Sequence, residues 1–390
     1  MRGKRDGRSG LCCLAMAAAL AAGAPVNVLG ACPGFARTAE GWATVRDNTL
    51  GYGEIPDLIH EYNSTVQNNL VSYEDYKGKD ANEIANDYRD AAEELYASIE
   101  WPSSDDAGYA MLYSAAESAQ AQAKQMEKMA DDNISDGMII KWQYDQAEAA
   151  LASTAQNLMN QYYQLQENLK TAQSGKELAE ASYNSTVTRQ SLGMATANEV
   201  LTAQEAVKTA EAGIITIESS IQSVKKNLQV MTGWAYNAEP EIAQMPEVNV
   251  TRIDAMNPET DLAKALETNY TLMIDKRKLE NSNDSANRQI QQQTIGNDEQ
   301  KIAAGLSDLY NDVLQARDAY SQAKTALELE ESNMAVAQKK YELGMIGRLE
   351  YLQAQNSYVG KQADFRIKEL SLQGSMDAYD WALKGNLALS

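Results

Sequence analysis

Residues that could carry covalent or metal chemistry are scarce in this chain of 390 residues. His60 is the only histidine, which excludes a Ser-His-Asp triad and a histidine-rich metal site. The acidic runs Asp105-Asp106, Asp131-Asp132 and Glu328 to Glu331 lack the alternating oxygen ligands of a calcium loop, and the sequence contains no glycine-rich phosphate loop. We therefore expect a protein that is not an enzyme and uses no cofactor and no metal.

The N-terminus has the pattern of an export signal. Residues 1–31 begin with a basic stretch, continue with an apolar core that contains two of the three cysteines, and end in small residues. Leu29-Gly-Ala-Cys32 resembles a bacterial lipoprotein signal at 29–32, although Pro33 follows directly. Lipidation of Cys32 and ordinary cleavage nearby both stay open. Either outcome leaves no disulfide framework and indicates an exported protein of a bacterial cell envelope.

Charge and hydropathy restrict the partners of the chain. The formal net charge of −21 disfavours nucleic acid and anionic lipid as binding partners. Beyond residue 40 no apolar run reaches the roughly 18 residues that a transmembrane helix needs. Contact with a membrane would then require a lipid anchor or a barrel.

The remaining kind of function is non-covalent recognition, and the candidate for it is a motif that occurs twice in the sequence. Residues 191–204 and 342–355 share seven identical positions at an offset of 151 residues. Both contain Leu-Gly-Met, in which Gly193 and Gly344 can take the left-handed conformation that ends a helix. Two interpretations stay open: a plain turn between helices, or a tip that docks a partner through Leu192, Gly193, Met194, Leu343, Gly344 and Met345.

Long helices must position these turns. After the first turn, Thr196 and Glu199 form a capping-box pattern, and the second copy keeps Glu350 but has Gly347 at the cap. The returning helices are expected over about 197–231 and 348–384. Before the second turn, apolar residues follow strict 4-3 heptad spacing, which predicts a coiled coil from Asp298 to Glu342, about 67 Å long. The seam comprises Ile302, Leu306, Leu309, Val313, Ala316, Tyr320, Ala323, Leu327, Met334, Ala337 and Tyr341.

The heptad register recurs in the first copy at the same offset, so the duplication includes the helices as well as the turn. The seam fits either a monomeric bundle or a tube wall shared between chains. The first copy is longer, and its extra residues fit an inserted helical hairpin at about 73–133, interrupted near Trp101. The expected organisation is a signal peptide (1–31), an extended N-terminal segment (32–50), a first repeat (51–233), a linker (234–257), a second repeat (258–385) and a tail (386–390).

These features resemble the outer-membrane efflux protein (TolC) family, whose chains are internal duplications. The matching residues are the asparagines Asn63 and Asn269 of the opening helices, the Leu-Gly-Met turn with its return helix, and the closing stretch Leu228 to Gly233. The resemblance implies a homotrimer that forms a helical tube capped by a β-barrel in the outer membrane. It also implies that the glycine turns meet a periplasmic adaptor attached to an ABC-type or similar pump.

One part of the family pattern is missing from the sequence. Each copy should carry two membrane strands between its opening helix and its long helix, but residues 281–296 are too polar to face lipid and are expected as a loop. In the first copy the helical insert occupies this position. The expected fold is therefore all-α: an elongated, internally duplicated bundle of long antiparallel coiled-coil hairpins, TolC-like without a clear β-barrel.

Two functions are compatible with this fold. The first is an exported TolC-like efflux or secretion component that forms a helical conduit or a docking element for an adaptor and a pump. The alternative is a barrel-less structural or interaction protein of the cell envelope that uses the hairpins as a coiled-coil spacer.

Overall fold

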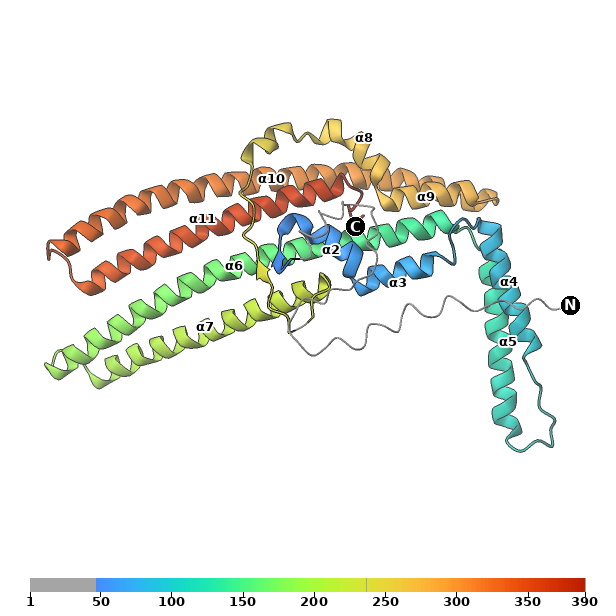
Figure 1. Cartoon of the computed structure of the whole chain (residues 1–390), viewed down its shortest axis with the longest axis horizontal. Helices are drawn as coiled ribbons and strands as arrows, with labels where there is room; N and C mark the ends of the chain where they lie inside the picture. Colours follow the sequence, from blue (N-terminus) through green and yellow to red (C-terminus); the bar gives the residue numbers. More distant parts are fainter. Residues whose placement is uncertain (1–46, 236, 390) are drawn as a thin grey trace.

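The computed structural model describes residues 47–235 and 237–389, so the expected signal peptide and Cys32 lie outside the described residues. The all-α expectation is confirmed. Four long helices dominate the molecule in Figure 1: α6 (Gly137–Ser191), α7 (Ala197–Met231), α10 (Ser285–Glu342) and α11 (Arg348–Ala382). They form two antiparallel hairpins, and both hairpin turns point toward the same end of the molecule (Figure 1).

The long helices lie side by side in the order α7, α6, α11, α10 (Figure 1). Each hairpin packs along its own length, and α6 packs against α11 to join the two copies. Within the described part of the chain, neither α7 nor α10 packs extensively along a second long helix. The bundle is therefore an open layer with two unpaired edges.

Short helices cover the end of the layer that lies away from the turns. The first copy opens with α2 (Ile55–Tyr62) and α3 (Ser64–Tyr73), and the second with α8 (Pro258–Thr268) and α9 (Tyr270–Asn281). Asn63 and Asn269 separate the helices of each pair, and each caps the second helix with its side-chain oxygen. The Asn63 amide donates to the Met231 carbonyl at 3.0 Å, and the Asn269 amide donates to the Leu387 carbonyl at 3.2 Å. The opening helices are thus tied to the last residue of the returning helix in the first copy and to the segment just after it in the second.

Within the described residues the body has two main hydrophobic clusters, one centred on each copy. Leu50, Ile59 and Leu228 are buried in the first cluster, whereas Ile302 and Leu306 are buried in the second. The segment between the copies also contributes to the core, because Met245 and Ile253 are buried. It contains β2 (Glu241–Ile242), which pairs in parallel with β1 (Thr49–Leu50), and the short helix η2 (Val250–Ala255); η1 (Tyr52–Glu54) follows β1.

The prediction of a polar loop at residues 281–296 is wrong, because α10 already begins at Ser285. The Asp284 side chain caps this helix by accepting a hydrogen bond from the Asn287 N–H at 2.9 Å. The glutamines that follow are good helix formers, and the segment packs against α9, so polarity alone did not argue against a helix. With 58 residues, α10 is about 87 Å long rather than 67 Å. The 55 residues of α6 span about 82 Å, so the two helices are closely matched.

A separate hairpin stands off the end opposite the turns (Figure 1). It consists of α4 (Ala81–Ala97) and α5 (Tyr109–Asp131), in the part of the first copy where the sequence contains extra residues. No helix among the described residues is both long enough and apolar enough to cross a membrane.

Asp136 connects the two copies at the start of α6. Its side chain is only 3% exposed and accepts hydrogen bonds from the Ile139 N–H at 2.9 Å, from Arg277 Nε at 2.6 Å and from Asn281 Nδ2 at 3.1 Å. Burial favours a higher pKa for this carboxyl group, but the three hydrogen bonds outweigh it and hold the pKa below its ordinary value.

Replacing Asp136 by Asn should lower the free energy of unfolding by about 1–2 kcal/mol at neutral pH, because the charged acceptor of Arg277 is lost. A lowered folded-state pKa stabilises the protein above the unfolded-state pKa, and this contribution disappears as the pH falls through the folded-state value. Urea unfolding of both proteins should therefore show a difference at pH 7 that shrinks below about pH 4. Asp284→Asn is the matched control, since this exposed cap of α10 loses no ion pair and Asn caps equally well. An equal loss in the two variants would contradict the prediction.

Candidate docking site

The two Leu-Gly-Met turns have the same backbone structure. In the first, the Gly193 N–H donates to the Gln190 carbonyl at 2.9 Å and the Met194 N–H donates to the Arg189 carbonyl at 2.8 Å. The second repeats this pattern, from Gly344 to Tyr341 at 2.9 Å and from Met345 to Lys340 at 2.8 Å. These paired bonds define a Schellman motif, which requires a left-handed residue. Gly193 and Gly344 supply it, with φ of 75° and 69°.

The apolar side chains of the turns face solvent. Leu192, Met194, Leu343 and Met345 are between 64% and 75% exposed. A Cβ atom placed on Gly193 or Gly344 would find nothing within 4 Å, so the space around each turn is open. We call these four side chains the hairpin-turn patch. The fold does not bury them, and a turn that served only to reverse the chain would not need them.

Each turn is held in place by different side chains. In the first copy the Thr196 N–H donates to Glu199 Oε2 at 2.7 Å and the Glu199 N–H donates to Thr196 Oγ1 at 3.2 Å. The bond from the Thr196 N–H also lowers the pKa of Glu199. In the second copy Gly347 provides no side-chain cap, and Glu350 lies in the first turn of α11, where its charge favours the helix N-terminus. Tyr341 and Tyr351 stack there instead, with ring centroids 4.6 Å apart, and join α10 to α11.

The outer helices carry exposed apolar residues that the sequence did not single out. Leu201 and Ile215 on α7 and Leu329 and Val336 on α10 are each more than half exposed. Among the described residues, which include all of α11, this inner helix has no large apolar side chain that is more than half exposed. Heptad spacing could not predict that the apolar residues of α7 and α10 are exposed. Which helix faces remain uncovered depends on the order of the helices in the layer.

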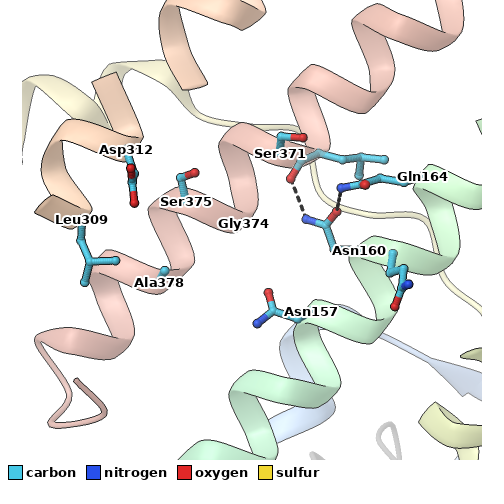
Figure 2. Close-up of a pocket in the computed structure, with 11 residues that line it drawn as sticks. Asn157, Asn160, Gln164, Leu309, Asp312, Ser371, Gly374, Ser375 and Ala378 are labelled. Atoms are coloured by element: carbon cyan, nitrogen blue, oxygen red, sulfur yellow. Dashed lines mark hydrogen bonds between the residues drawn. The ribbon is translucent and has the colours of Figure 1, made fainter. Parts of the chain in front are cut away.

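An open pocket of about 300 Å³ lies where α6, α10 and α11 meet. The Asn160 amide donates to the Leu370 carbonyl at 2.6 Å, and the Gln164 amide donates to Asn160 Oδ1 at 2.8 Å. Both bonds are drawn as dashed lines from Asn160 in Figure 2. Gly374 leaves room for Asn160, because a Cβ there would lie 3.3 Å from Asn160 Nδ2. The lining carries amides, hydroxyls and the carboxylate of Asp312, but no histidine, lysine or cysteine. The hydrogen bonds of Asn160 fix how α6 lies along α11, and the lining offers no pair of groups suited to acid-base chemistry.

The other candidate residues serve the structure. His60 lies 2.6 Å from Glu148 through Nδ1 and Oε1, and this hydrogen bond raises the pKa of the imidazole. Among the described residues, no three or more His, Cys, Asp or Glu side chains gather where they could hold a metal ion. Among the described residues, the hairpin-turn patch and the two open edges of the layer are thus surfaces that could recognise a protein partner.

Solved structures share this fold at low sequence identity. The Campylobacter jejuni CmeC outer membrane channel superposes with a TM-score of 0.54 at 11% identity, over 90% of this chain and 89% of that chain. A membrane protein from Pseudomonas aeruginosa gives 0.54 at 14% identity, over 86% and 90% of the two chains. The outer-membrane channel OprN gives 0.55 at 10% identity, over 88% and 92%.

At these identities the likeness establishes the fold, and in fold the predicted TolC resemblance is confirmed. No protein-family model and no curated protein matches the sequence.

Proposed function

We propose that the protein is a TolC-like component of an efflux or secretion path in the bacterial cell envelope. Its helices would form the wall of a conduit, and its turns would dock a periplasmic adaptor that is attached to an ABC-type or similar pump. One observation carries this proposal: two hairpins end on the same side of the molecule in the same Schellman turn, and each turn exposes a leucine and a methionine.

Assembly follows from the open edges of the layer. The edge helices α7 and α10 each lack a second long neighbour within the described residues, and both expose apolar side chains. Joining the α7 edge of one chain to the α10 edge of the next would bury these side chains, and repeating the contact closes a ring of three when each chain is rotated by one third of a turn from the last. We propose a homotrimer, in which three layers of four helices complete the tube. Such a conduit works by geometry and needs no covalent chemistry.

The hairpin-turn patch is suited to a helical partner. Leucine and methionine supply apolar area, and the flexible methionine side chain adapts to the surface it meets. Each buried leucine contributes roughly 1.5–3 kcal/mol to association. Because the two turns of one chain lie at the same end, a ring of three chains would present six such turns together.

A photo-crosslinking amino acid placed at Met194 or Met345 in cells of the native host should identify the partner. We expect adducts, identified by mass spectrometry, with a periplasmic adaptor. Adding Leu192→Ser and Leu343→Ser to the probe-bearing chain should lower the adduct yield about tenfold or more, because two apolar anchors are lost. Circular dichroism should remain unchanged, because both leucines are exposed in this structure.

The matched control carries the probe at Val71, which is equally exposed but lies on α3 at the other end of the molecule. That probe should give no adaptor adduct. Turn probes that capture no other protein would contradict docking and favour a structural spacer.

A further inference from the structure

The inserted hairpin has a thin core that consists of alanines apart from Ile84. Ala85 and Ala92 of α4 and Ala116, Ala123 and Ala130 of α5 are at most 6% exposed. Small residues at these positions let the two helices approach closely, so the pair forms a slender stalk. Within the described residues, α4 and α5 pack extensively only against each other. The hairpin therefore projects from the body without lateral support (Figure 1).

The base of the hairpin is fixed to the body. The Gly137 N–H donates to the Lys79 carbonyl at 2.9 Å, and a Cβ on Gly137 would lie only 2.1 Å from the Tyr76 carbonyl oxygen. The Asn133 amide donates to the Ala81 carbonyl at 2.7 Å and to the Ser135 carbonyl at 3.0 Å. These contacts hold the first residues of α4 and the last residues before α6 together. The direction of the hairpin is thus set at its base.

The far end of the hairpin gathers aromatic and apolar side chains. We call Trp101, Tyr109, Met111, Leu112 and Tyr113 the hairpin tip. The Tyr113 ring lies 5.5 Å from Trp101 and 5.6 Å from Tyr109, centroid to centroid, so the three rings form a cluster. All five side chains are exposed, Met111 to 81%. Within the described residues, each of the five keeps at least 38% of its surface exposed.

The charge around the hairpin tip narrows the choice of partner. Between Arg89 and Lys124 the sequence contains no lysine or arginine, whereas Glu100, Asp105 and Asp106 flank or join the tip. An anionic surface would be repelled. Tryptophan and tyrosine favour the interface between water and lipid, where the ring is buried and its polar group stays hydrated, and apolar side chains beside them enter the acyl region.

We propose that the hairpin tip inserts into the interfacial layer of a zwitterionic lipid bilayer and holds the body at a fixed distance from it. Met111 and Leu112 enter the acyl boundary, the three rings lie at the depth of the headgroups, and the nearby carboxylates face the cationic groups of those lipids. The inserted hairpin leaves the body at the end opposite the hairpin-turn patch and runs across the direction of the long helices, so its tip lies far from the patch and both surfaces can be occupied at once (Figure 1). Insertion of the tip adds a third kind of membrane contact to the lipid anchor and the barrel considered from the sequence, and it does not depend on the proposed transport function.

The test is a fluorescent probe at the tip of the full chain. Cys12, Cys13 and Cys32 are replaced by Ser, and Met111→Cys is labelled with an environment-sensitive dye. Vesicles of phosphatidylcholine should shift its emission to the blue, and lipids with a quencher in the upper acyl chain should quench it. Since the apolar segment of residues 11–20 can itself partition into bilayers, the readout is the local environment of residue 111. The same dye at Leu329→Cys on α10 is the matched control and should stay in water.

Two further measurements distinguish lipid from protein partners. Adding Trp101→Ser and Leu112→Ser should lower the quenching about tenfold, and replacing a third of the lipid by anionic phosphatidylglycerol should weaken it. A dye at residue 111 that remains in water with every vesicle would overturn the proposal. A blue shift that grows with protein concentration without lipid would also overturn it, because the tip would then bind a second copy of the chain.

Discussion

Gly385→Ala is expected to lower the free energy of unfolding by about 3 kcal/mol or more, because a left-handed backbone and a steric clash add together. Gly385 has a φ of 98°, which alanine adopts only with strain. Its Cβ would lie 2.2 Å from the Thr268 carbonyl oxygen, a backbone atom that cannot rotate away. Relieving the contact would also disturb the hydrogen bond from the Tyr270 N–H to the Gly385 carbonyl at 3.3 Å.

The first copy offers the same test at Gly233. Its φ is 85°, and a Cβ would lie 2.2 Å from the Cβ of Tyr62. Tyr62 and Thr268 directly precede the two capping asparagines, so in both copies the last turn of the returning helix is pressed against the break in the opening helices. Gly233→Ala should therefore destabilise the protein to a similar extent. The repeated close contact is what fixes each long hairpin to its base.

Two glycines serve as controls in the same urea unfolding experiment. Gly213 lies inside α7 with nothing within 4 Å of a Cβ, so Gly213→Ala should stabilise the protein, by up to about 1 kcal/mol. Gly193 is left-handed but surrounded by open space, so Gly193→Ala should cost only about 1–2 kcal/mol of backbone strain. An unfolding midpoint of Gly385→Ala equal to that of Gly213→Ala would contradict the account.

The sequence predicted best the features that depend on nearby residues. The Leu-Gly-Met turns and the helices over Ala197–Met231 and Arg348–Ala382 follow from glycine, capping residues and heptad spacing, all of which act within a few turns of helix. The predicted loop before α10 is wrong because polar residues do not exclude a surface helix where a capping residue and one packed face support it.

Features that depend on distant residues could not be predicted. Asn63 and Asn269 were recognised as a repeated pair, but their role in breaking the opening helices depends on carbonyls that lie 168 and 118 residues further along the chain. The contact between the copies, in which Asn160 fits against Gly374, depends equally on how α6 meets α11. The order of the helices, and with it the exposed edges, follows from such contacts.

The second large effect is expected when the α7 edge of one chain is chemically linked to the α10 edge of a neighbouring chain. Leu201 lies four residues after the start of α7, and Val336 lies six residues before the end of α10, so their heights differ by about 3 Å when measured from the turns. Both side chains are exposed, and the two helices occupy opposite edges of the layer. A cross-link between residues 201 and 336 of the same chain is therefore excluded by geometry, whereas a ring of chains brings these two positions together at every interface.

The most direct measurement of the central claim uses the chain with its three native cysteines replaced by Ser and with Leu201→Cys and Val336→Cys introduced together. Treatment with a flexible bis-maleimide should produce covalent dimers and trimers on a denaturing gel and nothing larger, because three interfaces close the ring. Either single-cysteine variant, as the matched control, should give no trimer. A double variant that stays monomeric under conditions where both cysteines react with a monofunctional maleimide would contradict the proposal that the open layer of helices is one third of a tube.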